Sequence, residues 1–271
     1  GALDRRGFLD KSSRFAAASG TTAVGLLAAL SPDFAQAQKV PPNDARIKTE
    51  RVEIASPAGH GKINALVARP ANASGALPVV LVIHENRGLN PHIEDIARRL
   101  AVDNFIAVEP DLLTSVGGYP GDEDKAREAF AKIDQAKARE DFVAAAAFAS
   151  KISGGNGKLG AVGFCYGGGI VNYLATRSPE LIAGVPFYGA AAPTADVPKI
   201  KAELMIVFAE NDERINTMWP AYEAALKAAG VKYTAFNYAG TQHGFNNDTT
   251  PRYDEKSAGL AWGRTVALFN R

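Results

Sequence analysis

Cysteine is nearly absent from this chain, since Cys165 is the single one among 271 residues. No disulfide can therefore form within the chain, and a lone thiol is either buried or kept for chemistry. Histidine is also scarce, with four residues, so few side chains can act as a neutral-pH base. The formal net charge is only +1. A charge this small lacks the basic footprint of a nucleic-acid-binding protein, so nucleic acid is excluded as a partner.

Long apolar runs are missing after the N-terminal leader, and no later segment is long and apolar enough to span a membrane. The leader itself places Arg5-Arg6 before Phe-Leu, then an Ala- and Leu-rich stretch at about 15–30, then Ala35-Gln36-Ala37. This arrangement is typical of a twin-arginine (Tat) signal that ends in a small-x-small cleavage site. An amphipathic helix packed on the domain is the alternative.

The leader gives a prediction for the whole chain. We expect a signal segment over residues 1–37, a short linker over 38–49 and a single catalytic domain over 50–271. Export by the Tat machinery, which would then be a transient partner, predicts a periplasmic or secreted protein with no membrane span in its mature form.

From residue 50 onward, strand-like and helix-like segments alternate. Short β-branched and apolar runs bounded by Gly, Pro or Asn predict strands, and longer charged or Ala-rich segments predict helices. This order predicts an α/β fold with one doubly wound, mostly parallel sheet and helices on both faces, in which ligands bind at the carboxyl ends of the strands. Strands are expected at 51–55, 62–69, 78–84, 105–109, 158–162, 181–188, 203–209 and 231–238, and helices at 91–103, 122–152 (one, or two with a break), from 170, 215–229 and 254–269.

The segment Gly163-Phe164-Cys165-Tyr166-Gly167 joins an apolar strand to a helix. Small residues two before and two after a nucleophile are what a sharp strand-to-helix turn requires, because a Cβ at those positions would collide with neighbouring elements. Cys165 occupies the nucleophile position, and the Tyr166 amide at the helix N-terminus favours a thiolate and an oxyanion. A buried cysteine in a glycine-rich turn is the alternative.

A thiol nucleophile needs a base and an acid that orients the base. His243 follows the last predicted strand, and Asp212 follows the strand before it. The chain order nucleophile, acid, base is that of α/β-hydrolases, so Cys165, Asp212 and His243 are the predicted triad. Taken singly, His243 could be a surface-loop histidine and Asp212 the N-cap of a helix.

The loop His84-Glu85-Asn86-Arg87-Gly88 follows another buried strand. In an α/β-hydrolase this loop supplies the second backbone amide of the oxyanion hole, here that of Asn86 beside that of Tyr166. Glu85 would lie near the thiol and could keep Cys165 neutral until substrate arrives, unless Glu85 simply pairs with Arg87. Arg87 and Tyr119, the latter in the loop 114–121, are candidates for substrate binding.

These motifs together, with Gly168 and with the pairs Asn211-Asp212 and Gly244-Phe245, resemble the dienelactone hydrolase family (carboxymethylenebutenolidases). The resemblance covers roughly residues 50–270. It implies a Cys-Asp-His hydrolase of small esters or lactones, with an acyl-enzyme on Cys165, Glu85 holding the thiol, and neither metal nor cofactor. The chain departs from the family at Asn247, where enzymes acting on dienelactone use an arginine to bind the substrate carboxylate, so the hydrolase class carries over better than the substrate.

Two other functions compete. A dinucleotide-binding oxidoreductase would need G-x-G-x-x-G after a strand, but Cys165 occupies the second glycine position. A non-catalytic, exported binding protein with the hydrolase fold is compatible with the sequence, but it would leave the nucleophile, acid and base unexplained.

Overall fold

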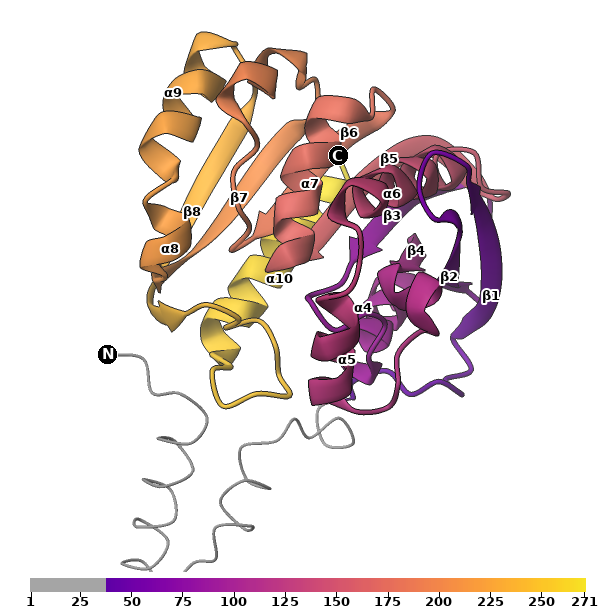
Figure 1. Cartoon of the computed structure of the whole chain (residues 1–271). Helices are drawn as coiled ribbons and strands as arrows, with labels where there is room; N and C mark the ends of the chain where they lie inside the picture. Colours follow the sequence, from indigo (N-terminus) through magenta and orange to yellow (C-terminus); the bar gives the residue numbers. More distant parts are fainter. Residues whose placement is uncertain (1–37) are drawn as a thin grey trace, which may run out of the picture.

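The computed structural model describes residues 38–271, and the predicted signal segment lies outside them. The described residues form an eight-stranded sheet in the order β1-β2-β4-β3-β5-β6-β7-β8 (Figure 1). Within it β2 is antiparallel to both β1 and β4, and the other neighbouring pairs are parallel. The predicted mostly parallel α/β sheet is thereby confirmed. The strands are β1 (Ile47–Ser56), β2 (Gly61–Pro70), β3 (Leu77–Ile83), β4 (Ile106–Asp111), β5 (Gly155–Phe164), β6 (Leu181–Phe187), β7 (Glu203–Asn211) and β8 (Tyr233–Gln242).

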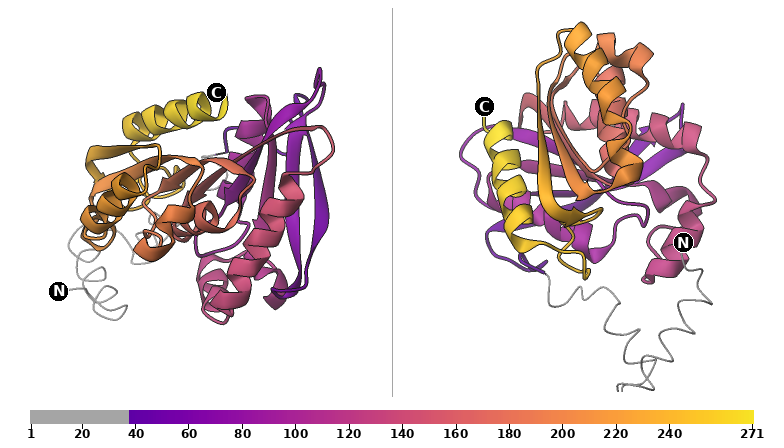
Figure 2. Two further views of the ribbon diagram at one scale, coloured as in Figure 1. Left: turned by 90° about the horizontal axis from the view of Figure 1, so that it is seen from above. Right: turned by 90° about the vertical axis from the view of Figure 1, so that its left-hand side faces the viewer.

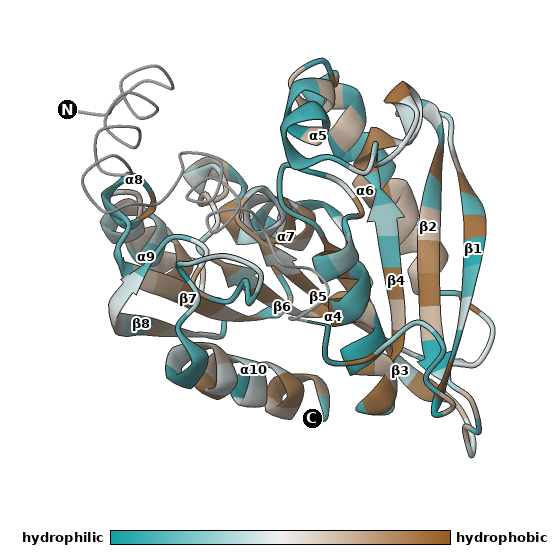
Figure 3. Cartoon of the chain, turned by 90° about the horizontal axis from the view of Figure 1, so that it is seen from below, coloured by the Kyte–Doolittle hydropathy of each residue, from teal (hydrophilic) through white to brown (hydrophobic). Residues whose placement is uncertain are grey.

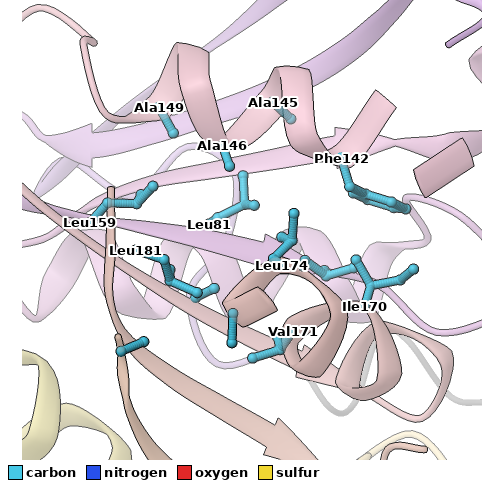
Figure 4. Packing of buried hydrophobic residues seen from close by; sticks show 14 of the residues in the cluster. Leu81, Phe142, Ala145, Ala146, Ala149, Leu159, Ile170, Val171, Leu174 and Leu181 are labelled. Carbon is cyan, nitrogen blue, oxygen red and sulfur yellow. The ribbon is translucent and has the colours of Figure 1, made fainter. Parts of the chain in front are cut away.

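Helices cover both faces of the sheet, as two separate cores show (Figure 2). The α-helices are α4 (Pro91–Val102), α5 (Glu123–Phe130), α6 (Gln135–Ala149), α7 (Tyr166–Arg177), α8 (Glu213–Asn216), α9 (Trp219–Ala228) and α10 (Glu255–Phe269), and the 3-10 helices are η1 (Leu112–Val116) and η2 (Thr194–Lys199). Apolar residues of α6 and α7 pack on one face (Figure 4). Those of α9 pack on the same face, and those of α4 and α10 pack on the other.

The buried parallel strands are apolar on both faces because helices cover both sides of the sheet. In β3, for example, Val80, Leu81, Val82 and Ile83 are all fully buried. Figure 3 shows this contrast, with hydrophobic residues concentrated in the strands and hydrophilic ones on the outer surfaces of helices such as α4 and α5. Within the described residues, no helix combines the length and apolar character needed to cross a membrane.

The helix boundaries refine the sequence prediction. The charged, Ala-rich region 122–152 is two helices, α5 and α6, which is the second of the two alternatives predicted, whereas the region 215–229, predicted as one helix, is broken between α8 and α9. β1 begins at Ile47, within the last residues of the predicted linker 38–49. Ahead of it, the backbone N–H of the buried Val40 donates to the Asp95 carboxylate of α4 at 2.8 Å.

Candidate active site

The turn between β5 and α7 holds Cys165 in an uncommon backbone conformation, with φ 56° and ψ −112°. A positive φ is rare for a residue with a Cβ, and it persists only where surrounding contacts enforce it. Here the Cys165 N–H donates to the Phe187 carbonyl of β6 at 3.1 Å, and the Cys165 carbonyl accepts from the Gly169 N–H in the first turn of α7. The turn therefore presents the Cys165 side chain at the carboxyl end of the sheet.

Glycine is required on both sides of Cys165, as the sequence predicted. A Cβ on Gly163 would lie 2.2 Å from the Gly167 carbonyl oxygen, and one on Gly167 would lie 2.2 Å from the Ile83 carbonyl oxygen. Both contacts are with backbone, which has no rotamer to give way. The absence of these two side chains thus lets β5, α7 and the end of β3 approach one another closely.

The Cys165 thiol is partly exposed and held in its neutral form. Burial and then the Glu85 carboxylate raise the pKa of Cys165 to about 11. The Tyr166 backbone N–H, which is hydrogen-bonded to the sulfur, and the guanidinium groups of Arg214 and Arg252 act in the opposite direction. The resting thiol is therefore protonated at neutral pH, although the groups that would stabilise a thiolate are already in place.

Asp212 and His243 form a hydrogen-bonded pair, with His243 Nδ1 lying 2.5 Å from Asp212 Oδ2. The Asp212 side chain is 6% exposed, and the Asp212 carboxylate makes no capping hydrogen bond to α8. Asp212 thus occupies the N-cap position of α8, but its carboxylate binds His243 and does not cap the helix. Because the carboxylate accepts at Nδ1, the pair leaves Nε2 of His243 as the nitrogen able to take a proton.

His84 is a structural residue in a buried environment. The Leu112 N–H donates to His84 Nε2 at 3.1 Å, so Nδ1 carries the proton, and it lies 2.5 Å from the Glu85 carbonyl oxygen. Burial lowers the pKa of His84, which agrees with a neutral ring. The imidazole therefore links the Glu85 backbone carbonyl to the Leu112 backbone N–H, which directly follows β4.

Glu85 is 8% exposed and accepts a hydrogen bond from Asn247 Nδ2 at 3.1 Å, a contact between residues 162 positions apart in the chain. Glu85 is not paired with Arg87, whose Nε lies 3.0 Å from Glu123 Oε2 instead. The alternative of a Glu85–Arg87 ion pair is therefore wrong. The neutral Asn247 amide contacts Glu85 at the position where the sequence departs from the family pattern.

The segment that follows β8, residues 243–247, contacts residues at the carboxyl ends of β6 and β3. Phe245 is fully buried, with its ring centroid 6.5 Å from that of Phe187 and 5.6 Å from that of Tyr188. The Tyr188 ring in turn lies 4.9 Å from the His243 ring. Since Asn247 then reaches Glu85, this segment joins the ends of β8, β6 and β3 around the Cys165 turn.

A pocket of about 560 Å³ opens at Cys165. Its polar lining comes from side chains such as Asn86, Arg139 and Arg214, and its apolar lining from residues of α5, α7 and the segment 190–193. A cavity of this size suits a small organic molecule. The lining residues are Asn86, Phe130, Gln135, Arg139, Cys165, Tyr166, Gly169, Ile170, Tyr173, Ala190, Ala191, Ala192, Pro193, Asp196, Arg214 and Ile215.

Arg87 and Tyr119, which the sequence suggested for substrate binding, are not among the residues that line this pocket. Both contact Glu123, because Tyr119 Oη donates to Glu123 Oε1 at 2.9 Å and Arg87 pairs with Oε2. The sequence did not predict Glu123, nor the contact between Asn247 and Glu85. The one available signal was indirect, namely the departure from the family pattern at Asn247.

Among the described residues, no group of three or more His, Cys, Asp or Glu side chains could hold a metal ion. The candidate site comprises the thiol, the Asp212–His243 pair, the Glu85 carboxylate and the backbone amides around them.

Comparison with known proteins places this arrangement in a family. The model of the dienelactone hydrolase family matches residues 63–271. A protein of Synechocystis sp. named "Putative carboxymethylenebutenolidase" is 34% identical over 241 residues, which are 82% of this chain and 96% of that protein. A protein of the same name from Salmonella typhi is 32% identical over 224 residues, 76% of this chain and 81% of that protein.

Solved structures agree with this placement. The crystal structure titled "Putative Dienelactone Hydrolase" from Klebsiella pneumoniae has a TM-score of 0.72 and 29% sequence identity, and the match covers 83% of this chain and 99% of that one. A thermostable esterase from Pseudomonas putida, at 18% identity and a TM-score of 0.66, shares the fold. The chain belongs to the dienelactone hydrolase family and has the α/β-hydrolase fold.

Proposed function

We propose that this protein hydrolyses a small ester or lactone through an acyl-enzyme on Cys165. One observation carries the proposal: the strained turn holds a partly exposed thiol at the mouth of a 560 Å³ pocket, beside a carboxylate that keeps it neutral. The Asp212–His243 pair supplies the base that such a thiol needs. The family names of its relatives support the same reaction class.

In the acylation step, substrate displaces the Glu85 carboxylate from the thiol, and His243 Nε2 takes the proton of Cys165. The Sγ thiolate attacks the carbonyl carbon, and the carbonyl oxygen becomes an oxyanion that accepts hydrogen bonds from the backbone amides of Asn86 and Tyr166. The C–O bond then breaks, and the leaving alkoxide takes the proton from the His243 imidazolium. For a lactone, the alcohol stays attached to the acyl group.

In the deacylation step, His243 removes a proton from water, and the hydroxide attacks the thioester carbonyl carbon. The C–S bond breaks, so that the carboxylic acid leaves and the sulfur regains a proton. Asp212 stays ionised throughout and stabilises the imidazolium in both steps. Every proton is returned, so the cycle needs no co-reactant other than water.

The proposal is tested with p-nitrophenyl esters of increasing acyl length and with small lactones, with alkylation by iodoacetamide alongside. We expect turnover of at least some short-chain substrates, because the pocket is of small-molecule size. The fraction of activity lost should equal the fraction of Cys165 that is alkylated. Turnover that survives complete labelling would contradict the proposal. The non-catalytic alternative is not favoured by the comparisons, which find hydrolases.

Glu85→Gln should make the resting thiol more reactive. The Glu85 carboxylate is the second cause, after burial, of the raised Cys165 pKa of about 11. Removing this negative charge lowers the pKa, and each unit of decrease raises the thiolate fraction at pH 7–8 about tenfold. We therefore expect iodoacetamide labelling to speed up about tenfold and its pH profile to move to lower pH. Glu180→Gln, just before the amino end of β6, is the control and should label at the wild-type rate. An unchanged pH profile of labelling in Glu85→Gln would contradict the role of Glu85 in keeping the thiol neutral.

We also propose that residues 1–37 direct export through the Tat pathway, followed by the single catalytic domain. The support is the Arg5-Arg6 pair, the apolar stretch after it and the Ala35-Gln36-Ala37 motif. The double substitution Arg5→Lys and Arg6→Lys should retain the protein in the cytoplasm, as measured by cell fractionation and immunoblotting. Equal periplasmic amounts of the wild type and this variant would contradict the proposal.

A further inference from the structure

Glu123, the first residue of α5, binds three side chains from two other segments. Its Oε2 lies 3.0 Å from Arg87 Nε, and its Oε1 accepts hydrogen bonds from Tyr119 Oη at 2.9 Å and from Asn90 Nδ2 at 3.3 Å. The Glu123 side chain is only 20% exposed, so these contacts are better shielded from solvent than those of a surface ion pair. A half-buried carboxylate that binds three donors holds those three side chains in fixed positions.

Two of these donors lie in the loop that follows β3. Arg87 also donates through Nη1 to Asn86 Oδ1 at 2.9 Å, and Asn86 lines the pocket. Asn90 caps α4, since its Oδ1 accepts from the Ile93 N–H at 3.1 Å. Glu123 therefore binds the loop at its middle and at its C-terminal end, just after the backbone amide assigned to the oxyanion.

The other end of α5 lies against the second half of the site. Phe130, the last residue of α5, lines the pocket, and its ring meets the Tyr166 ring edge-on at a centroid distance of 4.8 Å. The Tyr166 backbone N–H is the other amide assigned to the oxyanion, and it already contacts the Cys165 sulfur. The helix α5 (Figure 1) thus contacts both parts of the proposed oxyanion hole. Glu123 at its start binds Arg87 and Asn90 in the loop that contains Asn86, and Phe130 at its end packs against Tyr166.

We propose that Glu123 is a positioning residue for the oxyanion hole, holding the Asn86 amide opposite the Tyr166 amide through Arg87 and Asn90. The inference rests on the proposed function, because it needs an oxyanion to form at these two amides. Donors preorganised toward developing charge contribute only where their positions are fixed. A small misplacement of a catalytic group, even one caused by a remote substitution, is enough to lower the rate.

The test is Glu123→Gln, which keeps the size of the side chain but removes the charge paired with Arg87. We expect kcat to fall about tenfold or more, with KM changed less than about twofold, because the lost interaction acts mainly in the transition state. Glu128→Gln is the matched control, since Glu128 is exposed on the same helix and has no ion-pair partner in the described part of the chain. The control should behave as the wild type.

Two further measurements separate positioning from simple stabilisation. Inhibition by a trifluoromethyl ketone, which forms an oxyanion on the enzyme, should weaken in Glu123→Gln by the same factor as kcat/KM, while binding of the product acid stays unchanged. The double variant Arg87→Gln with Glu123→Gln should lose no more than the worse single variant, because both act through one contact.

A wild-type kcat in Glu123→Gln overturns the inference. So does a loss that vanishes when assays are run well below the melting temperature of the variant, since this would mark a purely structural role. A failure of the proposed function is recognised separately, because Cys165→Ala would then retain turnover whatever Glu123→Gln does.

Discussion

Cys165→Ala should abolish ester hydrolysis, with a fall in kcat of at least about 10³-fold. The thiol is the group that forms the bond to the substrate carbon in the proposed reaction, and alanine offers no replacement nucleophile. The backbone cost of the substitution is small in comparison, because cysteine and alanine both carry a Cβ and share the strain of φ 56°. The measurement is the initial rate on the best p-nitrophenyl ester, with enzyme in large excess over any contaminating esterase.

The control for this prediction is thermal unfolding of the same variant, which should stay within a few degrees of the wild type. Substrate binding should also survive, since the pocket lining is otherwise unchanged. Turnover above about a tenth of the wild-type rate would remove Cys165 from the role of nucleophile. The Asp212–His243 pair would then have to activate water directly.

Asp212→Asn is expected to lower kcat by about 10³- to 10⁴-fold with little change in fold. The carboxylate lies 2.5 Å from His243 Nδ1 and is the group that holds the imidazole with Nε2 free. An asparagine amide can turn its NH₂ toward Nδ1, which favours the wrong tautomer, and it cannot stabilise the imidazolium by charge. The effect should appear in kcat and in kcat/KM equally, because the lost interaction acts in the transition state.

Asp196→Asn is the matched control for this variant. Asp196 also lines the pocket, but its carboxylate is bonded to Lys199 at 2.6 Å and not to a catalytic group. We expect kcat of Asp196→Asn to stay within about threefold of the wild type. If Asp212→Asn retained activity at the level of Asp196→Asn, the acid of the proposed triad would have to be sought elsewhere.

The sequence alone was sufficient to predict the strands and to predict which strand ends carry the residues of the candidate site. Strand periodicity is local, and the rule that parallel strands present ligands at their carboxyl ends then brings Cys165, Asp212 and Glu85 to one edge. The glycines around Cys165 were predictable for the same reason, because a sharp turn has known steric requirements. These inferences depend on short stretches of chain, where physical rules are strongest.

Contacts between distant side chains were not predictable. The hydrogen bond from Asn247 to Glu85 depends on the path of the segment after β8, which is set by the packing of Phe245 against Phe187 and Tyr188. Likewise, nothing local indicates that Arg87 pairs with Glu123 and not with the nearby Glu85. The sequence left open whether 122–152 is one helix or two, since Ala-rich sequence has helical propensity on both sides of the break between α5 and α6, and the break between α8 and α9 was missed.

The covalent intermediate is the defining feature of the proposed reaction, and acid quenching during turnover can trap it. A thioester should accumulate on an ester with a good leaving group, where acylation is fast, and low pH should preserve it for mass spectrometry of the digested protein. We expect a mass increase equal to that of the acyl group on the peptide that contains Cys165. Rapid hydrolysis with an unmodified Cys165 peptide in every quenched sample, or an acyl group on another residue, would contradict it.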